Sequence, residues 1–334
     1  MGGKKTEEIM KENQMKREEI AMLKDGTFLK DKDVPLMQKR WCKYAENSNI
    51  QMTVLSFYQN YIDENINIKE LQKKIATDVI PKFLSYSGYE NPKENLIKCE
   101  KFIKKASEKN ADIIIFPEMA LTGFTMNVKS LNLKEEFILD WIKSKAFENN
   151  INIALGYGIK VNEKGKNKFC IVSSKKNILG LYTKIHPFSY SGEDEKFYKG
   201  NEIISCKVKD AHVTPFICYD LRFPEIFQIA SKKSEIIIVI ASWPKEREEH
   251  WITLLKARAI ENQCFIIGVN RVGIGEKIEY LGASLIFDPL GNSLNKKSSK
   301  EELIIKDLDL SKIKEIRETI NIKKDRREKF YKES

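Results

Sequence analysis

The sequence has 334 residues, enough for one large α/β domain or two smaller ones, and 42% hydrophobic residues allow a sizeable core. The net charge of +10 is spread over interspersed acids and bases, so no basic arm for nucleic acid is expected. Residues 1–19 lack the apolar stretch of a signal peptide, and no apolar run approaches the ~18 residues of a membrane-spanning helix. We therefore expect a cytoplasmic protein that binds neither nucleic acid nor membrane.

The predicted elements become clear only beyond residue 90. Residues 1–50 predict a polar helical extension of unknown role, and 51–58 predicts a short strand. Asn91 and Pro92 are typical of a helix start, and helical spacing of apolar residues continues to Ala106. Hydrophobic patterning then predicts strands at 113–116, 151–157, 169–173, 178–182, 212–217, 236–241, 264–269, 281–287 and 301–308, and helices at 133–147, from Pro224, at 245–262 and at the charged C-terminal end.

This order of elements indicates a layered α/β sandwich, with sheets inside and helices outside. We expect the extension at 1–50, one main domain at 51–320 in which 51–90 is atypical, and a charged tail at 321–334.

Three predicted strands end in a polar residue where a core would favour an apolar one: Glu118, Lys184 and Cys218. A buried carboxylate can take a proton from a thiol, and a lysine can stabilise a developing oxyanion. A thiol between a strand and a helix lies near exposed amides, which favour the thiolate. Singly, each has an ordinary explanation as a capping carboxylate, a surface lysine or a small buried cysteine. Together, each at a strand end and in the order Glu, Lys, Cys, they favour a catalytic role more than any one of them does alone.

The surrounding boxes, FPEM (116–119), YTKIHP (182–187) and FICYDLRFPE (216–225), closely resemble the motifs of the nitrilase superfamily. The likeness runs from about residue 91 to 309. It implies a four-layer α-β-β-α sandwich with Glu118 as general base, Lys184 as oxyanion stabiliser and Cys218 as nucleophile. It also implies a second active-site glutamate, for which Glu193 is the first choice and Glu195 the alternative, and at least a homodimer that buries the long helix and the C-terminal segment.

Three further boxes, ASWP (241–244), HWITLLKARAIENQ (250–263) and GVNR (268–271), resemble the omega-amidase branch of that superfamily. This resemblance implies hydrolysis of the terminal amide of 2-oxoglutaramate or 2-oxosuccinamate, through a thioester, to acid and ammonia. The backbone N–H of Tyr219 is expected to help hold the oxyanion, and Trp243 is expected to line the pocket. Arg222 either binds a substrate carboxylate or braces the turn through an acid, and the sequence leaves both open.

Other functions remain as alternatives. The chain could be an N-carbamoyl amidohydrolase or a nitrilase, or less readily a non-enzymatic protein that uses 1–90 for docking. No cofactor and no metal are expected, because His186, His212 and His250 are too scattered for a metal site. The glycine-rich segment 268–275 lacks the spacing of a dinucleotide-binding motif and predicts a loop. The other cysteines are expected to be reduced, mostly as apolar fillers: Cys42, Cys99, Cys170, Cys206 and Cys264.

Overall fold

The computed structural model describes residues 92–275 and 278–333. The chain divides into two units, Met1–Glu94 and Asn95–Ser334, and nearly all of the first lies outside the described residues. The predicted extension at 1–50 and the predicted strand at 51–58 therefore also lie outside them.

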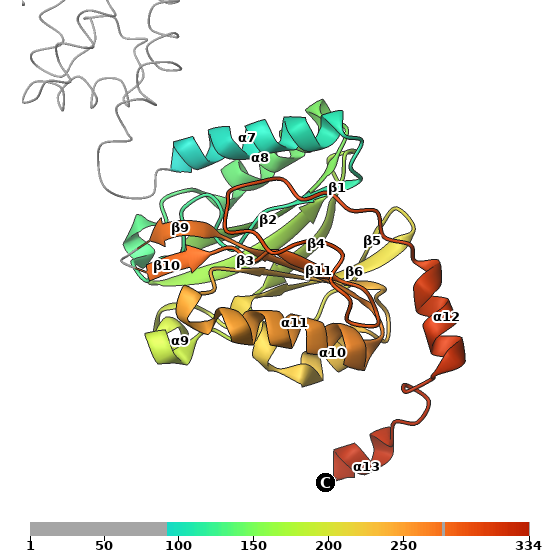
Figure 1. Ribbon diagram of the computed structural model, residues 1–334. Helices are drawn as coiled ribbons and strands as arrows, with labels where there is room; N and C mark the ends of the chain where they lie inside the picture. The colour runs from blue at the N-terminus through green and yellow to red at the C-terminus, as the bar shows by residue number, and fades with distance from the viewer. Residues whose placement is uncertain (1–91, 276–277, 334) are drawn as a thin grey trace, which may run out of the picture. The chain divides into compact units, whose positions relative to one another are not determined.

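The first sheet has the strand order β1-β2-β3-β4, with β1 and β2 parallel and the other pairs antiparallel. Two helices, α7 and α8, cover its outer face (Figure 1). Alternation in β3 explains the layering, because Cys170 and Val172 face these helices while Phe169 and Ile171 face the second sheet. The elements are α7 (Pro92–Glu108), β1 (Ile113–Ile115), α8 (Glu135–Glu148), β2 (Asn152–Val161), β3 (Lys164–Val172) and β4 (Ile178–Thr183).

The second sheet has the order β11-β8-β7-β6-β5, and its central strands β6, β7 and β8 are parallel. The near-continuous apolar run of β7 fits a strand that is buried on both faces. Because the three strands run the same way, their carboxyl ends meet at one edge. The elements are β5 (Cys206–Val208), β6 (Ala211–Ile217), α10 (Pro224–Ala230), β7 (Ile236–Ala241), α11 (Glu248–Asn262), β8 (Phe265–Asn270) and β11 (Leu285–Phe287).

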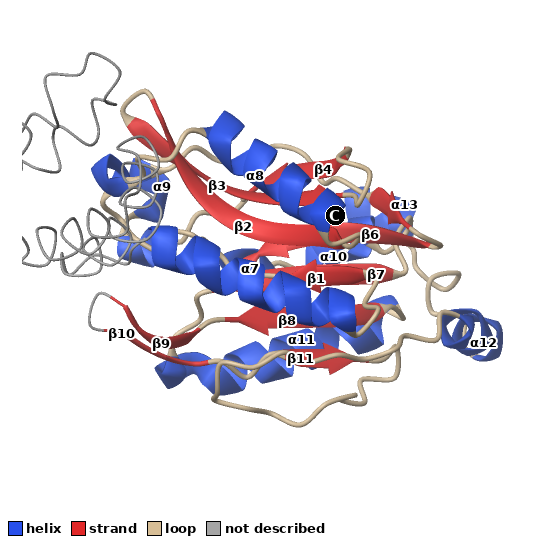
Figure 2. Ribbon diagram, turned by 90° about the horizontal axis from the view of Figure 1, so that it is seen from above, coloured by secondary structure: helices blue, strands red, loops and turns tan. Residues whose placement is uncertain are grey.

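The two sheets pack face to face, and α10 and α11 cover the outer face of the second (Figures 1 and 2). Tyr182 of β4 meets Phe216 of β6 edge-on across the interface, with ring centroids 5.8 Å apart. The predicted four-layer α-β-β-α sandwich is confirmed. Gly156 of β2 lies where the two sheets pack closely, because a Cβ there would come within 2.5 Å of Ile240 and 2.6 Å of the Pro117 carbonyl oxygen.

Most predicted elements are present, but three expectations were wrong. The strand predicted at 281–287 is two strands, since Gly282 and Ala283 both have positive φ and break it. Segment 268–275 is not a loop: it forms the end of β8 and strand β9, which pairs with β10. The remaining elements are η3 (Val128–Ser130), η4 (Ser189–Ser191), α9 (Glu193–Lys196), η5 (Cys218–Arg222), η6 (Lys245–Arg247), β9 (Val272–Gly275), β10 (Ile278–Leu281), α12 (Ser311–Thr319) and α13 (Glu328–Glu333).

Residues 301–308 form no strand, which is the third difference. Leu303 packs against the core under α7 and α8. The apolar residues of this segment are therefore explained by side-chain burial, although the segment pairs with no strand. A cavity of about 460 Å³ is lined by this segment, β1 and β8. None of the helices in the described ranges has the length and apolarity that crossing a membrane requires.

Candidate active site

The Cys218 turn joins β6 to α10. Cys218 begins the short helix η5 with a φ of +48°, a left-handed conformation that is strained for a residue with a side chain. Ile217 before it and Asp220 after it are buried, while Cys218 is only partly so. The turn therefore holds the thiol at the carboxyl edge of the second sheet.

The side chain of Asp220 holds this turn in place through hydrogen bonds. Its Oδ2 accepts hydrogen bonds from the Ile217 N–H at 3.0 Å and the Tyr182 hydroxyl at 2.7 Å. Its Oδ1 accepts from the His186 N–H at 3.0 Å and lies 2.8 Å from His186 Nδ1. The His186 ring in turn stacks on Phe223 at 3.8 Å. One fully buried carboxylate thus ties the Cys218 turn to the chain that carries Lys184.

Glu118 follows β1 and Pro117, and Met119 after it also has a positive φ of 47°. The carboxylate is 1% exposed, and hydrogen bonds hold both of its oxygens. Oε1 accepts from Lys184 Nζ at 3.1 Å and from Asn167 Nδ2 at 2.8 Å. Oε2 accepts from the backbone N–H of Ser242 at 2.8 Å. Groups from both sheets therefore orient Glu118.

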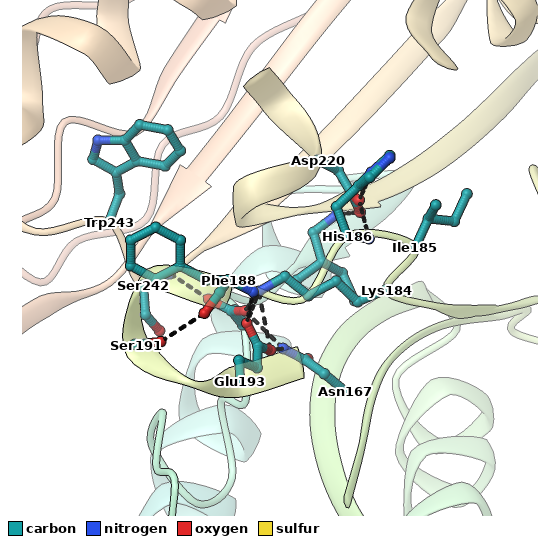
Figure 3. A network of polar contacts seen from close by, with 12 residues as sticks. Asn167, Lys184, Ile185, His186, Phe188, Ser191, Glu193, Asp220, Ser242 and Trp243 are labelled. Atoms are coloured by element: carbon teal, nitrogen blue, oxygen red, sulfur yellow. Dashed lines mark hydrogen bonds and ion pairs between the residues drawn. The ribbon is translucent and has the colours of Figure 1, made fainter. Parts of the chain in front are cut away.

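Glu193 completes the cluster from the start of α9. Lys184 Nζ lies 2.8 and 3.1 Å from its two oxygens, and the Phe188 N–H donates to Oε2 at 2.6 Å (Figure 3). Asn167 Nδ2 also donates to Oε1 at 3.1 Å, so one amide spans both carboxylates. Glu195, the alternative considered from sequence, is exposed.

Burial and charge act in opposite directions on Lys184. Burial alone would lower its pKa, but the charges of Glu118 and Glu193 outweigh that effect and hold the pKa above its ordinary value. The direction of this shift favours the charged ammonium.

The thiol of Cys218 is shifted in the same direction for a different reason. Burial raises its pKa well above the usual range, Glu118 and Glu193 raise it further, and Lys184 and the Ser242 N–H lower it only in part. The direction of this shift favours the protonated thiol. Such a thiol needs a base beside it before it can attack.

The expected substrate contacts surround the Cys218 turn. The Tyr219 ring packs against Phe188 at 4.9 Å, and Trp243 is buried with its indole N–H donated to the Arg247 carbonyl oxygen. The Arg222 guanidinium lies over the Trp243 ring at 4.9 Å and donates to His250 Nδ1 at 3.3 Å. Within the part of the chain that the structure describes, Arg222 therefore meets an aromatic face and an imidazole and pairs with no carboxylate.

The sequence reasoning missed several residues that hold the cluster. Along β3, Asn167 lies on the same face as Phe169 and Ile171, which point toward the second sheet. A polar residue among these apolar alternate positions was therefore the available signal. Arg258 gives the bracing that was considered for Arg222, because its Nε and Nη2 both donate to the Leu221 carbonyl oxygen, at 3.2 and 2.8 Å. Helical spacing places Arg258 on the buried face of α11, three residues after Leu255, so a charged residue in an apolar stripe was the available signal.

No three His, Cys, Asp or Glu residues are grouped so as to hold a metal ion within 92–275 and 278–333. His186, His212 and His250 contact Asp220, Glu235 and Arg222 respectively.

Comparison with known proteins decides the family. The model of the family described as "Carbon-nitrogen hydrolase" matches residues 84–318. The chain belongs to the carbon–nitrogen hydrolase family. Among curated members, it is 34% identical to the 2-oxoglutaramate amidase of Bacillus subtilis over 248 residues, which cover 73% of this chain and 95% of that protein. It is 33% identical to omega-amidase YafV of Escherichia coli K12, over 54% of this chain and 70% of that protein.

Solved structures agree with this assignment. A CN-hydrolase superfamily protein from Xanthomonas campestris superimposes with a TM-score of 0.67 at 25% identity, covering 71% of this chain and 92% of the other. The resemblance to the nitrilase superfamily and its omega-amidase-like branch is confirmed. As a carbon–nitrogen hydrolase, the protein is an enzyme that cleaves carbon–nitrogen bonds by adding water.

Proposed function

We propose that this carbon–nitrogen hydrolase cleaves the terminal amide of a small carboxylate-bearing substrate of the 2-oxoglutaramate type, with Cys218 as nucleophile. The observation that carries the proposal is the buried cluster beside the Cys218 turn, in which Lys184 bridges Glu118 and Glu193. A fully charged lysine, a desolvated carboxylate and a thiol held in a strained turn are the groups that acyl transfer to sulfur requires.

In the acylation step, Glu118 takes the proton of the Cys218 thiol and the thiolate attacks the amide carbonyl carbon. The oxyanion is stabilised by the Lys184 ammonium and the backbone N–H of Tyr219. The carbon–nitrogen bond then breaks, its electron pair passes to nitrogen, and nitrogen takes the proton back from Glu118. Ammonia leaves, and a thioester remains on Cys218.

In the deacylation step, Glu118 takes a proton from a water molecule, and the hydroxide attacks the thioester carbonyl. The sulfur leaves as thiolate, Glu118 returns the proton to it, and the acid is released. Lys184 keeps its proton throughout, which agrees with the raised pKa that its two carboxylate neighbours impose. Glu193 holds the lysine through both of its oxygens and takes no proton.

The carboxylate of the substrate is assigned to Arg222. Its guanidinium carbon lies 4.9 Å from the centre of the Trp243 ring, and no carboxylate among the described residues pairs with it. Relatives named 2-oxoglutaramate amidase and omega-amidase support a substrate of this class.

The test is ammonia release from 2-oxoglutaramate, compared with an N-carbamoyl amino acid and a nitrile. Turnover of the amide is expected, and Cys218→Ala should reduce it to background. Cys170→Ala, a buried cysteine between the first sheet and its helices, is the matched control and should retain turnover. Intact-mass detection of an acyl adduct that Cys218→Ala lacks would support the thioester, and full activity of Cys218→Ala would overturn the mechanism.

We further propose a homodimer through the outer face of α10 and α11. Ile229 on α10 and Ile260 on α11 are 53% and 45% exposed, and Leu290 nearby is 59% exposed. Light scattering should give twice the chain mass, and Ile260→Glu should give a monomer.

A further inference from the structure

Ser242 lies immediately after β7, beside the Cys218 turn. β6 and β7 are parallel, with Ile217 opposite Ile240, so both chains pass the same edge of the sheet within two residues of that pair. The Ser242 N–H donates to Glu118 Oε2 at 2.8 Å. The same N–H contributes to the environment of the Cys218 sulfur. The backbone of Ser242 is thus fixed between the proposed base and the proposed nucleophile.

The hydroxyl of Ser242 differs from the other buried hydroxyls of the second sheet. Ser242 is 6% exposed, yet its Oγ has no hydrogen-bond partner among the described residues. Thr214 Oγ1, by contrast, lies 2.7 Å from Ser234 Oγ. Buried hydroxyls are nearly always hydrogen-bonded, to protein or to ordered water, so this hydroxyl beside Glu118 is open to a contact with a bound substrate.

The chemistry of the neighbours identifies that partner. Lys184 and the Tyr219 N–H are donors and suit the oxyanion. Glu118 must reach the other side of the reacting carbon, where nitrogen receives its proton. The Ser242 N–H donates to Glu118 Oε2, so Ser242 adjoins the carboxylate that would give its proton to the nitrogen. A primary amide presents two N–H groups there, and each needs an acceptor once water has been displaced.

We propose that Ser242 Oγ accepts a hydrogen bond from an N–H of the scissile primary amide and thereby turns the nitrogen lone pair toward the proton on Glu118. The inference rests on the proposed amidase function and adds a contact to the leaving group. It predicts that Ser242 matters when nitrogen leaves and does not matter when the leaving group needs neither an N–H acceptor nor a proton.

The test compares Ser242→Ala with the wild type on two substrates that share one acyl group, a primary amide and a 4-nitrophenyl ester. Acylation by the ester is followed as the nitrophenolate burst, and acylation by the amide as ammonia release in a single turnover. We expect Ser242→Ala to slow amide acylation about 10- to 100-fold, equivalent to about 1.4–2.7 kcal/mol, and to leave the ester burst unchanged. The melting temperature should stay the same or rise, since the hydroxyl removed has no partner in the fold.

Thr214→Val is the matched control, because it removes a buried hydroxyl of β6 that is hydrogen-bonded to Ser234. It should lower the melting temperature and leave the amide-to-ester ratio unchanged. An equal loss on amide and ester in Ser242→Ala, or no loss on either, would overturn the inference. A wild-type enzyme that hydrolyses the ester but no primary amide would overturn the proposed function instead, so the two failures are distinguishable.

Discussion

Replacing Asp220 by asparagine separates the support of the Cys218 turn from its chemistry. Asp220 does not touch the proposed reacting atoms, yet its four hydrogen bonds connect Ile217 to the His186 segment that follows Lys184. Asparagine keeps one oxygen, which can still accept from His186. Its NH₂ group replaces the other oxygen, and the Tyr182 hydroxyl can turn to accept from it. The Ile217 N–H, however, then faces a donor.

The expected loss in the free energy of unfolding follows from the Ile217 N–H that loses its acceptor and from the lost charge. A buried N–H without an acceptor costs about 1–3 kcal/mol. The remaining bonds weaken as well, because charge-assisted hydrogen bonds are about twice as strong as neutral ones. Asparagine carries no charge, so the free-energy cost of burying the Asp220 carboxylate disappears and offsets part of this loss. We therefore expect a net destabilisation of about 2 kcal/mol. For a domain of this size that corresponds to a melting temperature lowered by about 4–8 °C.

Activity should fall by more than stability suggests. The folded variant no longer holds Cys218 at its strained φ, and misplacement of a reacting group by about 1 Å costs about 100-fold in rate. We expect kcat for the amide to fall about 10- to 100-fold, with KM little changed, measured well below the melting temperature. Tyr182→Phe, which removes one of the four bonds, should give a smaller loss of the same kind.

Asp288→Asn is the control for a merely structural carboxylate. Asp288 is 7% exposed and accepts hydrogen bonds from Leu290 and Asn292 in a turn outside the candidate site. It should lower the melting temperature and leave kcat unchanged. If Asp220→Asn melts and turns over like the wild type, or if both variants lose kcat in proportion to stability, the reasoning is refuted.

Three further predictions concern the charges and thiols. Lys184→Met should lower the free energy of unfolding by about 3–5 kcal/mol, seen in urea titrations, because two buried carboxylates lose their cation, and an unchanged urea midpoint would contradict this. Glu193→Gln should abolish most turnover while Glu195→Gln retains it, and the reverse result in the ammonia assay would exchange their roles. Burial raises the pKa of Cys170 to about 12. The unfolded thiol ionises near pH 8.5, so this cysteine leaves stability unaffected below about pH 8 and lowers it as pH rises above that; the stability difference between wild type and Cys170→Ala should therefore shrink by about 2 kcal/mol between pH 7 and pH 10.

The sequence predicted the parts of the molecule that local patterns determine. Glu118, Lys184 and Cys218 each interrupt an apolar run at a strand end, and the structure gathers them around one buried cluster. The bond between Asp220 and His186 joins residues 34 positions apart, and no local pattern encodes such a distance. Asn167 was detectable in principle, because it breaks the inward phase of β3.

The incorrect strand boundaries have physical causes of the same kind. Residues 301–308 are apolar enough for a strand, but a strand also needs a neighbouring backbone, which only the tertiary arrangement supplies. The break at Gly282 and Ala283 depends on positive φ values. Alanine rarely adopts a positive φ, so its presence does not predict a break. Propensity describes what a segment can form, whereas pairing depends on what lies next to it.

Because residues from two sheets form the site, activity depends on how far the chain has folded. Glu118, Lys184 and Asn167 are encoded in the first sheet, and Cys218 and Ser242 in the second. A nascent chain with only its first sheet folded holds the carboxylates and the lysine but no nucleophile, and a chain whose sheets have separated holds a thiol without its base. Neither partial form can attack an amide, so hydrolytic activity appears only with the completed layers. The rate at which ammonia release recovers during refolding therefore measures when the two sheets pack together, which a spectroscopic signal from one sheet alone does not.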